Sequence, residues 1–314
     1  MSLKSIKGKI RSINKTRQVT KAMEAVSAVK MRKSQEQALL ARPFALSALK
    51  MLKRLSKTVE SKDHILMKER AVKKVLFIVI TSDRGLAGGL NSSVIKSVVK
   101  LISDRGLSQE EVTLTCIGRK GFEYFQKRGY TILEHNERKD DNVSLENLEH
   151  IALKAGNLFE SGECDEVFIA YTNFVSTLKQ DVVIRKMLPI HFDEIQSLIG
   201  GIVPVRGKYA HLFDGMTESL TGSVDAAVVD YFYEPTVDVA MNSVLYYLLN
   251  VFVYHSMLEA KASEFSARMV AMKSASDKAL DLSKALTLKF NKVRQSAITR
   301  EVSEIIGGME TLAI

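Results

Sequence analysis

The sequence predicts an α/β protein in which a long antiparallel two-helix coiled coil is made from the N- and C-terminal segments. A central, mostly parallel α/β domain is expected between them. The two ends carry long stretches without Gly or Pro, whereas the middle alternates short apolar runs with helical patterns. Only 17 Gly and 4 Pro occur in 314 residues, which favours long helices over a turn-rich β protein. The predicted parts are 1–57, 73–233 and 234–314.

The first segment is expected to be an amphipathic helix of about 50 residues. No Gly or Pro lies between Gly8 and Pro43, so Pro43 is the position where a kink or a break is expected. The apolar residues follow the 3, 4, 3 spacing of a heptad stripe at Leu3, Ile6, Ile10 and Ile13. The stripe continues less strictly through Val19, Met23, Val26 and Val29.

The middle segment begins with the apolar run Val75–Ile80, the turn SDRGLAGG and a helix from about Leu90. Alternation of strands and helices predicts a mostly parallel, Rossmann-like sheet covered by helices. The last two strands are close in sequence, so they are expected to form an antiparallel hairpin at the sheet edge. The later elements are expected in this order: strand 112–117, helix 118–129, helix 144–160, strand 166–171 and strand 182–189. Residues 134–149 are expected to be a solvated loop and helix cap, and 196–224 another loop.

The C-terminal segment has no Gly or Pro from Thr236 to Ile306. A helix of about 70 residues spans roughly 105 Å, far more than a domain of this size can cover. We therefore expect most of it to pack on the N-terminal helix, and the remainder to be single or covered by a partner. The helix is expected to begin at Glu234-Pro235 and to end at Gly307-Gly308, because Pro is common at the start of a helix and Gly just after its end. Its apolar stripe is wide from Val244 to Val253 and becomes narrow and alanine-rich after Val270.

The net charge of +9 lies on the first segment alone. Residues 1–57 carry a net charge of +13, residues 58–233 a net charge of −4, and residues 234–314 none. An acidic partner for the first helix is the natural inference. The alternatives are a solvated charged face and a coiled-coil adaptor that binds polyanions. Phe44 is the one aromatic residue of this segment, so nucleic-acid bases would have no stacking platform.

No motif predicts a catalytic, cofactor or metal site. The turn SDRGLAGG lacks the Lys of a phosphate loop and the spacing of the dinucleotide fingerprint, which weakens a nucleotide-enzyme hypothesis. A tight turn with one or two residues of positive φ is the expected structure, and a contact surface is the alternative. The six His show no metal-binding spacing. Cys116 and Cys164 form no CxxC pair, which favours a reducing compartment, and no apolar run is long enough for a membrane span.

Three blocks, in chain order, resemble the gamma subunit of F-type ATP synthase. They are KSIKGKIRSINKTRQVTKAMEAVSAVKMRKSQ, ITSDRGLAGGLN, and SEFSARMVAMKSASDKA with FNKVRQSAITREVSEIIGG. The resemblance covers the whole chain. It implies a rotor subunit of the central stalk of the F1 complex, which takes part in ATP synthesis and in hydrogen ion or sodium transport without being an enzyme itself.

The resemblance also implies partners and a location. The coiled coil would turn inside a ring of alpha and beta subunits, and the central domain would lie at the foot, near the epsilon subunit and the c-ring. Each angle of an asymmetric shaft would press differently on the three beta subunits. No nucleic acid, cofactor or direct membrane span is implied. The absence of a transit extension favours a peripheral protein on the cytoplasmic face of a bacterial inner membrane.

The resemblance assigns subunit contacts to single positions. Met23 matches the family position that faces the beta lever, and the positions that interact with it or with the beta catch are Arg268, Gln295, Thr299 and Glu301. Charge alone adds Lys21, Arg32 and Arg294. The foot turn would contribute Asp83, Arg84 and Gly85. The chain departs from the family at Ala87, often Cys, and at Phe265, often Gln, for which the sequence offers no reason.

Overall fold

The computed structural model describes residues 2–55, 64–137, 146–191 and 236–312. The predicted loop 196–224 lies outside these residues. The described chain forms two compact units, Met1–Val29 with Arg268–Ile314, and Lys30–Ala267. The helix α1 (Leu3–Leu55) and the helix α7 (Val237–Leu312) each contribute to both units.

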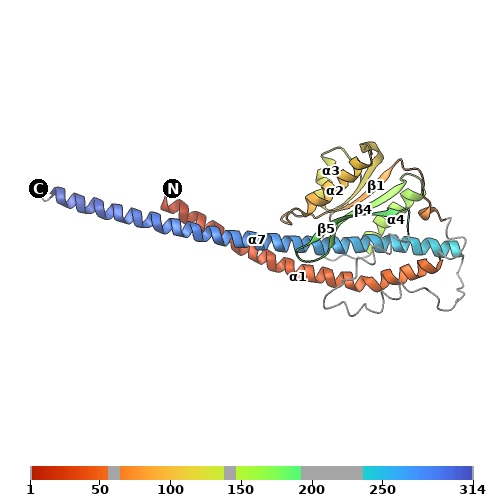
Figure 1. Ribbon diagram of the computed structural model, residues 1–314, viewed down its shortest axis with the longest axis horizontal. Helices are drawn as coiled ribbons and strands as arrows, with labels where there is room; N and C mark the ends of the chain where they lie inside the picture. Colours follow the sequence, from red (N-terminus) through yellow and green to blue (C-terminus); the bar gives the residue numbers. More distant parts are fainter. Residues whose placement is uncertain (1, 56–63, 138–145, 192–235, 313–314) are drawn as a thin grey trace. The chain divides into compact units, whose positions relative to one another are not determined.

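In the first unit, α1 and α7 run antiparallel (Figure 1) and pack along a heptad seam. The α1 side of the seam keeps the phase of Ile6 and continues through Thr20 and Ser27, which are 0%, 8% and 3% exposed. The α7 side includes Ser276 and Ser283, both buried. The Ser283 hydroxyl donates a hydrogen bond of 2.8 Å to Asn14 Oδ1 and so marks the register of the two helices.

The predicted continuation of the α1 stripe is therefore wrong. The side chains of Val19, Val26 and Val29 are 59%, 54% and 69% exposed, because the seven-residue period started by Ile6 is continued by small hydroxyl residues. The hydroxyls of Thr20 and Ser27 donate to carbonyls of their own helix, Arg17 and Met23, so their burial leaves these donors satisfied. The valines form a second, outward-facing stripe.

One predicted helix end differs, because α7 continues past Gly307 and Gly308 to Leu312. The helix α1 continues through Pro43 to Leu55, in agreement with the expected helix of about 50 residues. All residues from 298 to 306 are exposed. The prediction that the end of the C-terminal helix is single or covered by a partner agrees with this exposure.

The second unit contains a five-stranded sheet in the order β3-β2-β1-β4-β5. The strands β1, β2, β3 and β4 pair in parallel, and β4 pairs with β5 in an antiparallel hairpin at the edge, which confirms the predicted fold class. The strand bounds are β1 Val75–Ile80, β2 Val112–Ile117, β3 Thr131–Asn136, β4 Glu166–Phe174 and β5 Gln180–Leu188. The helices are α2 Leu90–Asp104, α3 Arg119–Gln126 and α4 Glu146–Glu160, with short 3-10 turns at Ile65–Met67 and Gln109–Glu111.

Each face of the sheet has its own core because successive side chains of a strand point to opposite faces. On one face, Leu76, Ile78 and Ile80 pack against α4 and against the first part of α7. On the other face, Val75, Phe77 and Val79 pack against α2 and α3. Cys164 is buried in the first core and Cys116 in the second. The wide stripe of α7 is thus used on the sheet, which the sequence did not predict.

Candidate functional site

The foot turn between β1 and α2 is organised by polar side chains rather than by a ligand-binding loop. Asn91 Oδ1 accepts a hydrogen bond of 2.9 Å from the backbone N–H of Ser82, and the Ser82 hydroxyl donates to the carbonyl of Arg84. Leu86 and Gly88 have φ of 66° and 59°, as expected for one or two positions in such a turn. These bonds tie the turn to the first residues of α2.

Thr81 joins this turn to the N-terminus of α3. Its hydroxyl donates toward the Gly118 carbonyl and accepts from the Gly121 N–H at 2.9 Å. Gly118 has a φ of 96°, and a Cβ there would lie 2.1 Å from the Thr81 carbonyl oxygen. Close backbone contact therefore occupies the carboxyl end of β1, where many α/β proteins hold a ligand.

The predicted foot residues have unequal exposure. Asp83 is half-buried, and its carboxylate accepts a hydrogen bond of 2.9 Å from the Arg119 N–H. Arg84 and Gly85 are exposed, and Leu86 beside them is 62% exposed. The turn thus presents a cation and an apolar side chain at one point of the surface.

On the helices, the predicted contact residues fall into separate groups. In α1, Met23 is half-buried, Lys21 is exposed and pairs with Glu24 at 3.0 Å, and Arg32 is exposed. Arg268 is 8% exposed in α7. The remaining four lie exposed near the end of α7: Arg294, Gln295, Thr299 and Glu301.

The register of the helix pair keeps the first and last groups apart. Starting from the Asn14–Ser283 contact, Met23 and Gln295 lie in opposite directions along antiparallel helices. At about 1.5 Å per residue they are roughly 30 Å apart. The structure therefore brings together Lys21 with Met23, and Arg294 with Gln295, Thr299 and Glu301, but does not bring these two sets together.

Exposed apolar residues adjoin both groups and were not among the predicted contacts. Val19 and Val26 flank Met23 on α1, with Lys21 beside them. Ile298 and Val302 lie among the last group on α7 and are 50% and 47% exposed. The signal was present in the sequence as valines and isoleucines at helical spacing, but without the seam it could not be told from core.

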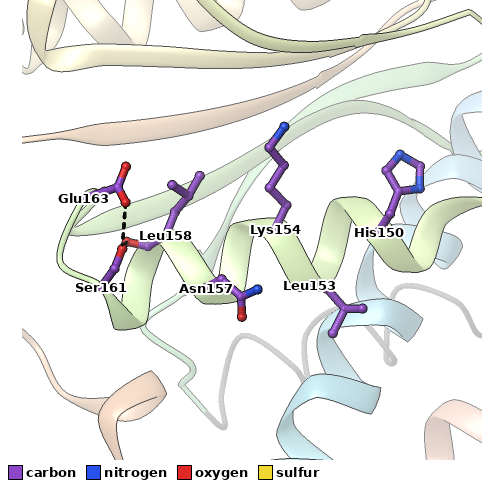
Figure 2. Close-up of a pocket in the computed structure, with 7 residues that line it drawn as sticks. All are labelled: His150, Leu153, Lys154, Asn157, Leu158, Ser161 and Glu163. Carbon is purple, nitrogen blue, oxygen red and sulfur yellow. Dashed lines mark hydrogen bonds between the residues drawn. The ribbon is translucent and has the colours of Figure 1, made fainter.

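A groove in the second unit lies along α4 and has a volume of about 440 Å³. Figure 2 shows that His150 and Lys154 project to one side of α4, and Leu153 and Asn157 to the other. Its full lining is His150, Leu153, Lys154, Asn157, Leu158, Ser161 and Glu163. At one end of the groove the Ser161 hydroxyl donates a hydrogen bond of 3.2 Å to Glu163.

The charges at one side of this groove are mutually satisfied. Glu134 of β3 accepts from Asn136 at 2.7 Å, and it pairs with His150 at 2.8 Å and Lys154 at 3.2 Å. Burial alone would raise the pKa of Glu134, but the hydrogen bonds from Asn136 and Lys154 and the charge of His150 outweigh it, so the pKa is lowered. The cluster ties the edge strand to α4.

Within the described ranges, no three His, Cys, Asp or Glu side chains are arranged to hold a metal ion. No helix in those ranges is both long and apolar enough to cross a lipid bilayer.

The chain is similar to known proteins over nearly its whole length. The family model described as ATP synthase matches residues 2–312. The ATP synthase gamma chain of Brevibacillus brevis is 34% identical over 311 residues, covering 99% of both chains. That of Cupriavidus necator is 37% identical over 308 residues, covering 97% of both.

Solved structures share the fold. A chain of the Euglena gracilis mitochondrial ATP synthase, in an OSCP/F1/c-ring structure, aligns with a TM-score of 0.63 at 18% identity, covering 99% of this chain and 94% of that one. A chain from the central stalk and c-ring structure of the Tetrahymena thermophila mitochondrial ATP synthase aligns with a TM-score of 0.59 at 23% identity, covering 82% of this chain and 99% of that one. With a family match and relatives that span its whole length, this chain belongs to the ATP synthase gamma chain family.

Proposed function

We propose that this chain is the central-stalk rotor subunit of a rotary ATP synthase, and that it carries no catalytic site of its own. Full-length similarity to gamma chains at 34–37% identity carries the proposal. Its partners would be the alpha and beta subunits of the F1 ring, the epsilon subunit and the c-ring. The bacterial relatives support a peripheral position on the cytoplasmic face of a bacterial cell membrane.

The helix pair has properties that suit a turning shaft. Its seam is narrow and partly built from hydroxyl residues, while its outer surface combines cations with isolated valines. A net charge of +13 on residues 1–57 would attract acidic segments of a surrounding ring. A wide apolar outer face would bind the surrounding ring in one orientation of the shaft. Small, separated apolar contacts would let the contact with the ring change as the shaft turns.

Two contact areas on the helices would serve different tasks. The area of Lys21 and Met23 would act on the beta lever, and the area from Arg294 to Glu301 would meet the beta catch and guide the end of α7. Arg32 and Arg268 are each proposed as further contacts. The foot turn, with Asp83, Arg84 and Gly85, would form a third contact. Separation by roughly 30 Å along the helices means that single substitutions can test the first two areas independently.

The test of the function is co-expression of this chain with the alpha, beta and epsilon subunits of one synthase. We expect a stoichiometric complex by sizing, and ATP hydrolysis that depends on the presence of this chain. The purified chain alone should neither bind ATP tightly nor hydrolyse it. Salt-sensitive binding to any polyanion without assembly would instead support the adaptor alternative.

The lever area is tested by Met23→Lys. A second cation beside Lys21 changes the charge of the contact without changing the seam, because Met23 is only half-buried. We expect ion movement per ATP hydrolysed to fall more than complex yield does. Unchanged coupling would place the lever contact elsewhere.

A further inference from the structure

One stretch of α7 is hydrogen-bonded to the backbone of the β4–β5 hairpin. The Ser263 hydroxyl donates 2.9 Å to the Thr172 carbonyl, and the Ser266 hydroxyl donates 2.8 Å to the Thr177 carbonyl. Glu259 accepts 3.0 Å from the Phe174 N–H. The spacing of the three α7 residues, four and then three, places them on a single helix face.

These contacts are shielded from water. Ser263 and Ser266 are 0% exposed and Glu259 is 8% exposed. Each bond goes to a main-chain group of the hairpin, so the arrangement depends on the path of the hairpin and not on its side chains. Buried hydrogen bonds are directional, whereas the apolar packing elsewhere between α7 and the sheet is not.

The hairpin connection itself is held in shape. Gln180 Nε2 donates to the carbonyls of Ser176 and Thr177, both at 3.1 Å, and at 3.4 Å to the hydroxyl of Ser266. The Val175 N–H donates to the Lys179 carbonyl at 3.3 Å. The helix α7 is therefore hydrogen-bonded to a structured turn at the sheet edge.

The same stretch of α7 is held on another side by α1. Phe265 is 7% exposed, and Lys30 Nζ lies 5.7 Å from the centre of its ring. This distance is within the range of a cation–π interaction. Phe265, for which the sequence offered no reason, thus lies where α1 and the hairpin both meet α7.

The structure assigns to Glu259, Ser263 and Ser266 the role of positioning residues that lock α7 to the α/β domain against rotation about the helix axis. The inference rests on the proposed rotor function. A shaft under load must not turn within the domain that receives the torque. Directional bonds from three positions of one helix face resist such a turn, because a twist of α7 carries all three away from their partners together.

The test uses the complete membrane-bound complex in vesicles, with ATP hydrolysis and ATP-driven ion pumping measured on the same preparation. Ser263→Ala, Ser266→Ala and their double variant remove the donors in steps. Glu259→Met removes an acceptor, whereas Glu259→Gln keeps one. We expect hydrolysis without an opposing gradient to stay unchanged, and pumping per ATP to fall progressively as the gradient grows in all but Glu259→Gln.

Hydrogen exchange supplies a residue-level measurement. Loss of one net hydrogen bond shifts an opening equilibrium by about two- to tenfold, so the Phe174 amide should exchange faster by that factor in Glu259→Met. In Glu259→Gln its rate should stay close to that of the unaltered chain. Faster exchange of the Phe174 amide, together with pumping per ATP that falls as the gradient grows, supports the proposed lock.

Two serines provide matched controls. Ser34 is 3% exposed, and its hydroxyl donates a hydrogen bond of 3.1 Å within α1, to the Lys30 carbonyl. Ser243 lies on α7 itself and bonds to its own helix at Val239. Ser34→Ala and Ser243→Ala remove a buried hydroxyl and an α7 hydroxyl, respectively, and should leave pumping per ATP at the unaltered value under every gradient.

The outcomes of these experiments distinguish a failure of the proposed lock from a failure of the proposed rotor function. Full pumping in the double variant under load, or loss of hydrolysis and pumping in equal proportion, overturns the lock and leaves the rotor standing. Loss of assembly already in Ser263→Ala shows a purely structural role and also overturns it. Failure of the unaltered chain to assemble contradicts the proposed function instead.

Discussion

Gly156 shows how closely α4 approaches α7. A Cβ at this position would lie 2.5 Å from Tyr246 Cε1, and the Tyr246 hydroxyl donates to Asn157 Oδ1 at 3.1 Å on the same side. Gly156→Ala should therefore lower the free energy of unfolding by about 1–3 kcal/mol through overpacking. Urea denaturation of the full chain, followed by circular dichroism, measures the change.

Gly8 is the matched control for this prediction. It is also helical, but a Cβ there would meet nothing within 4 Å. Gly8→Ala should raise stability by up to about 1 kcal/mol, because Ala favours the helix. If Gly156→Ala were stabilising to the same extent, the close approach of α4 and α7 would be refuted.

Glu134 predicts a dependence of stability on acid. Its pKa is below the ordinary value of 4.5, so the folded state favours the carboxylate. The contribution is present above the ordinary value and is lost as pH falls through the lowered folded pKa. The stability gap between the unaltered chain and Glu134→Gln should be constant near neutral pH and should narrow below about pH 4.5.

The partners of Glu134 provide the check. Lys154→Met removes a hydrogen bond and a charge that lower the folded pKa of Glu134, so the loss of stability in acid should be smaller and should be complete at a higher pH than in the unaltered chain. The assignment would be contradicted if the stability difference between the unaltered chain and Glu134→Gln widened in acid, or if Lys154→Met left its pH dependence unchanged.

At the scale of elements, the sequence predicted those whose pattern is strong. Strand 112–117 and the antiparallel edge hairpin are confirmed, and α2 begins at the predicted Leu90. The strand β3 was missed, because residues 134–149 were interpreted as a loop and cap. Its side chains are mostly half-buried at the sheet edge and several are polar, so alternation is weak there.

For the first third of α7, the sequence predicted burial but not the element that buries it. Its wide stripe from Val244 to Val253 predicted heavy burial, but the assumed partner was the N-terminal helix. The structure uses it against the sheet beside α4. A helical stripe indicates how much surface is covered and does not identify the element that covers it. The predicted continuation of the α1 stripe was wrong for a related reason. The seam continues through Thr20 and Ser27, which are not apolar and so were not recognised as part of it.

The seam of α1 and α7 leads to an element-scale prediction. The Asn14–Ser283 hydrogen bond crosses the helix pair, and polar pairs at such seams fix register. A double-mutant cycle with Asn14→Ala and Ser283→Ala should give a coupling energy of about 0.5–1.5 kcal/mol in urea unfolding.

Asn14→Ala with Ser276→Ala is the comparison for this cycle, because Ser276 is buried on the same seam two turns away. That pair should be additive. Equal coupling in both cycles would show that the effect belongs to general seam packing and not to the hydrogen bond.

At the scale of the whole molecule, the family and the fold class were available from the sequence, because the three long blocks span the chain. The division into 1–57, 73–233 and 234–314 stays a prediction. The contact residues stay proposals too, because the side chains that would meet them belong to other chains. The relation of α7 to the hairpin required coordinates, since hydrogen bonds to main-chain groups leave no trace in a sequence pattern.

The residues that follow 306 in the sequence are the subject of a prediction at this scale. Deleting 307–314 should leave assembly intact and reduce the maximal rate only mildly, because the contacts proposed for the end of α7 lie at Arg294 to Glu301. Sizing and ATP hydrolysis of the complex measure this. Complete loss of assembly would move the essential contact to the deleted residues.

The two cysteines have a practical consequence for experiments on rotation. Burial raises the pKa of Cys116 and Cys164 to about 12, so neither offers a thiolate to a maleimide at neutral pH. A cysteine introduced at an exposed position such as Lys100 should then be the sole site of labelling in the folded chain. Fluorophores or beads can be attached there without first removing a native thiol.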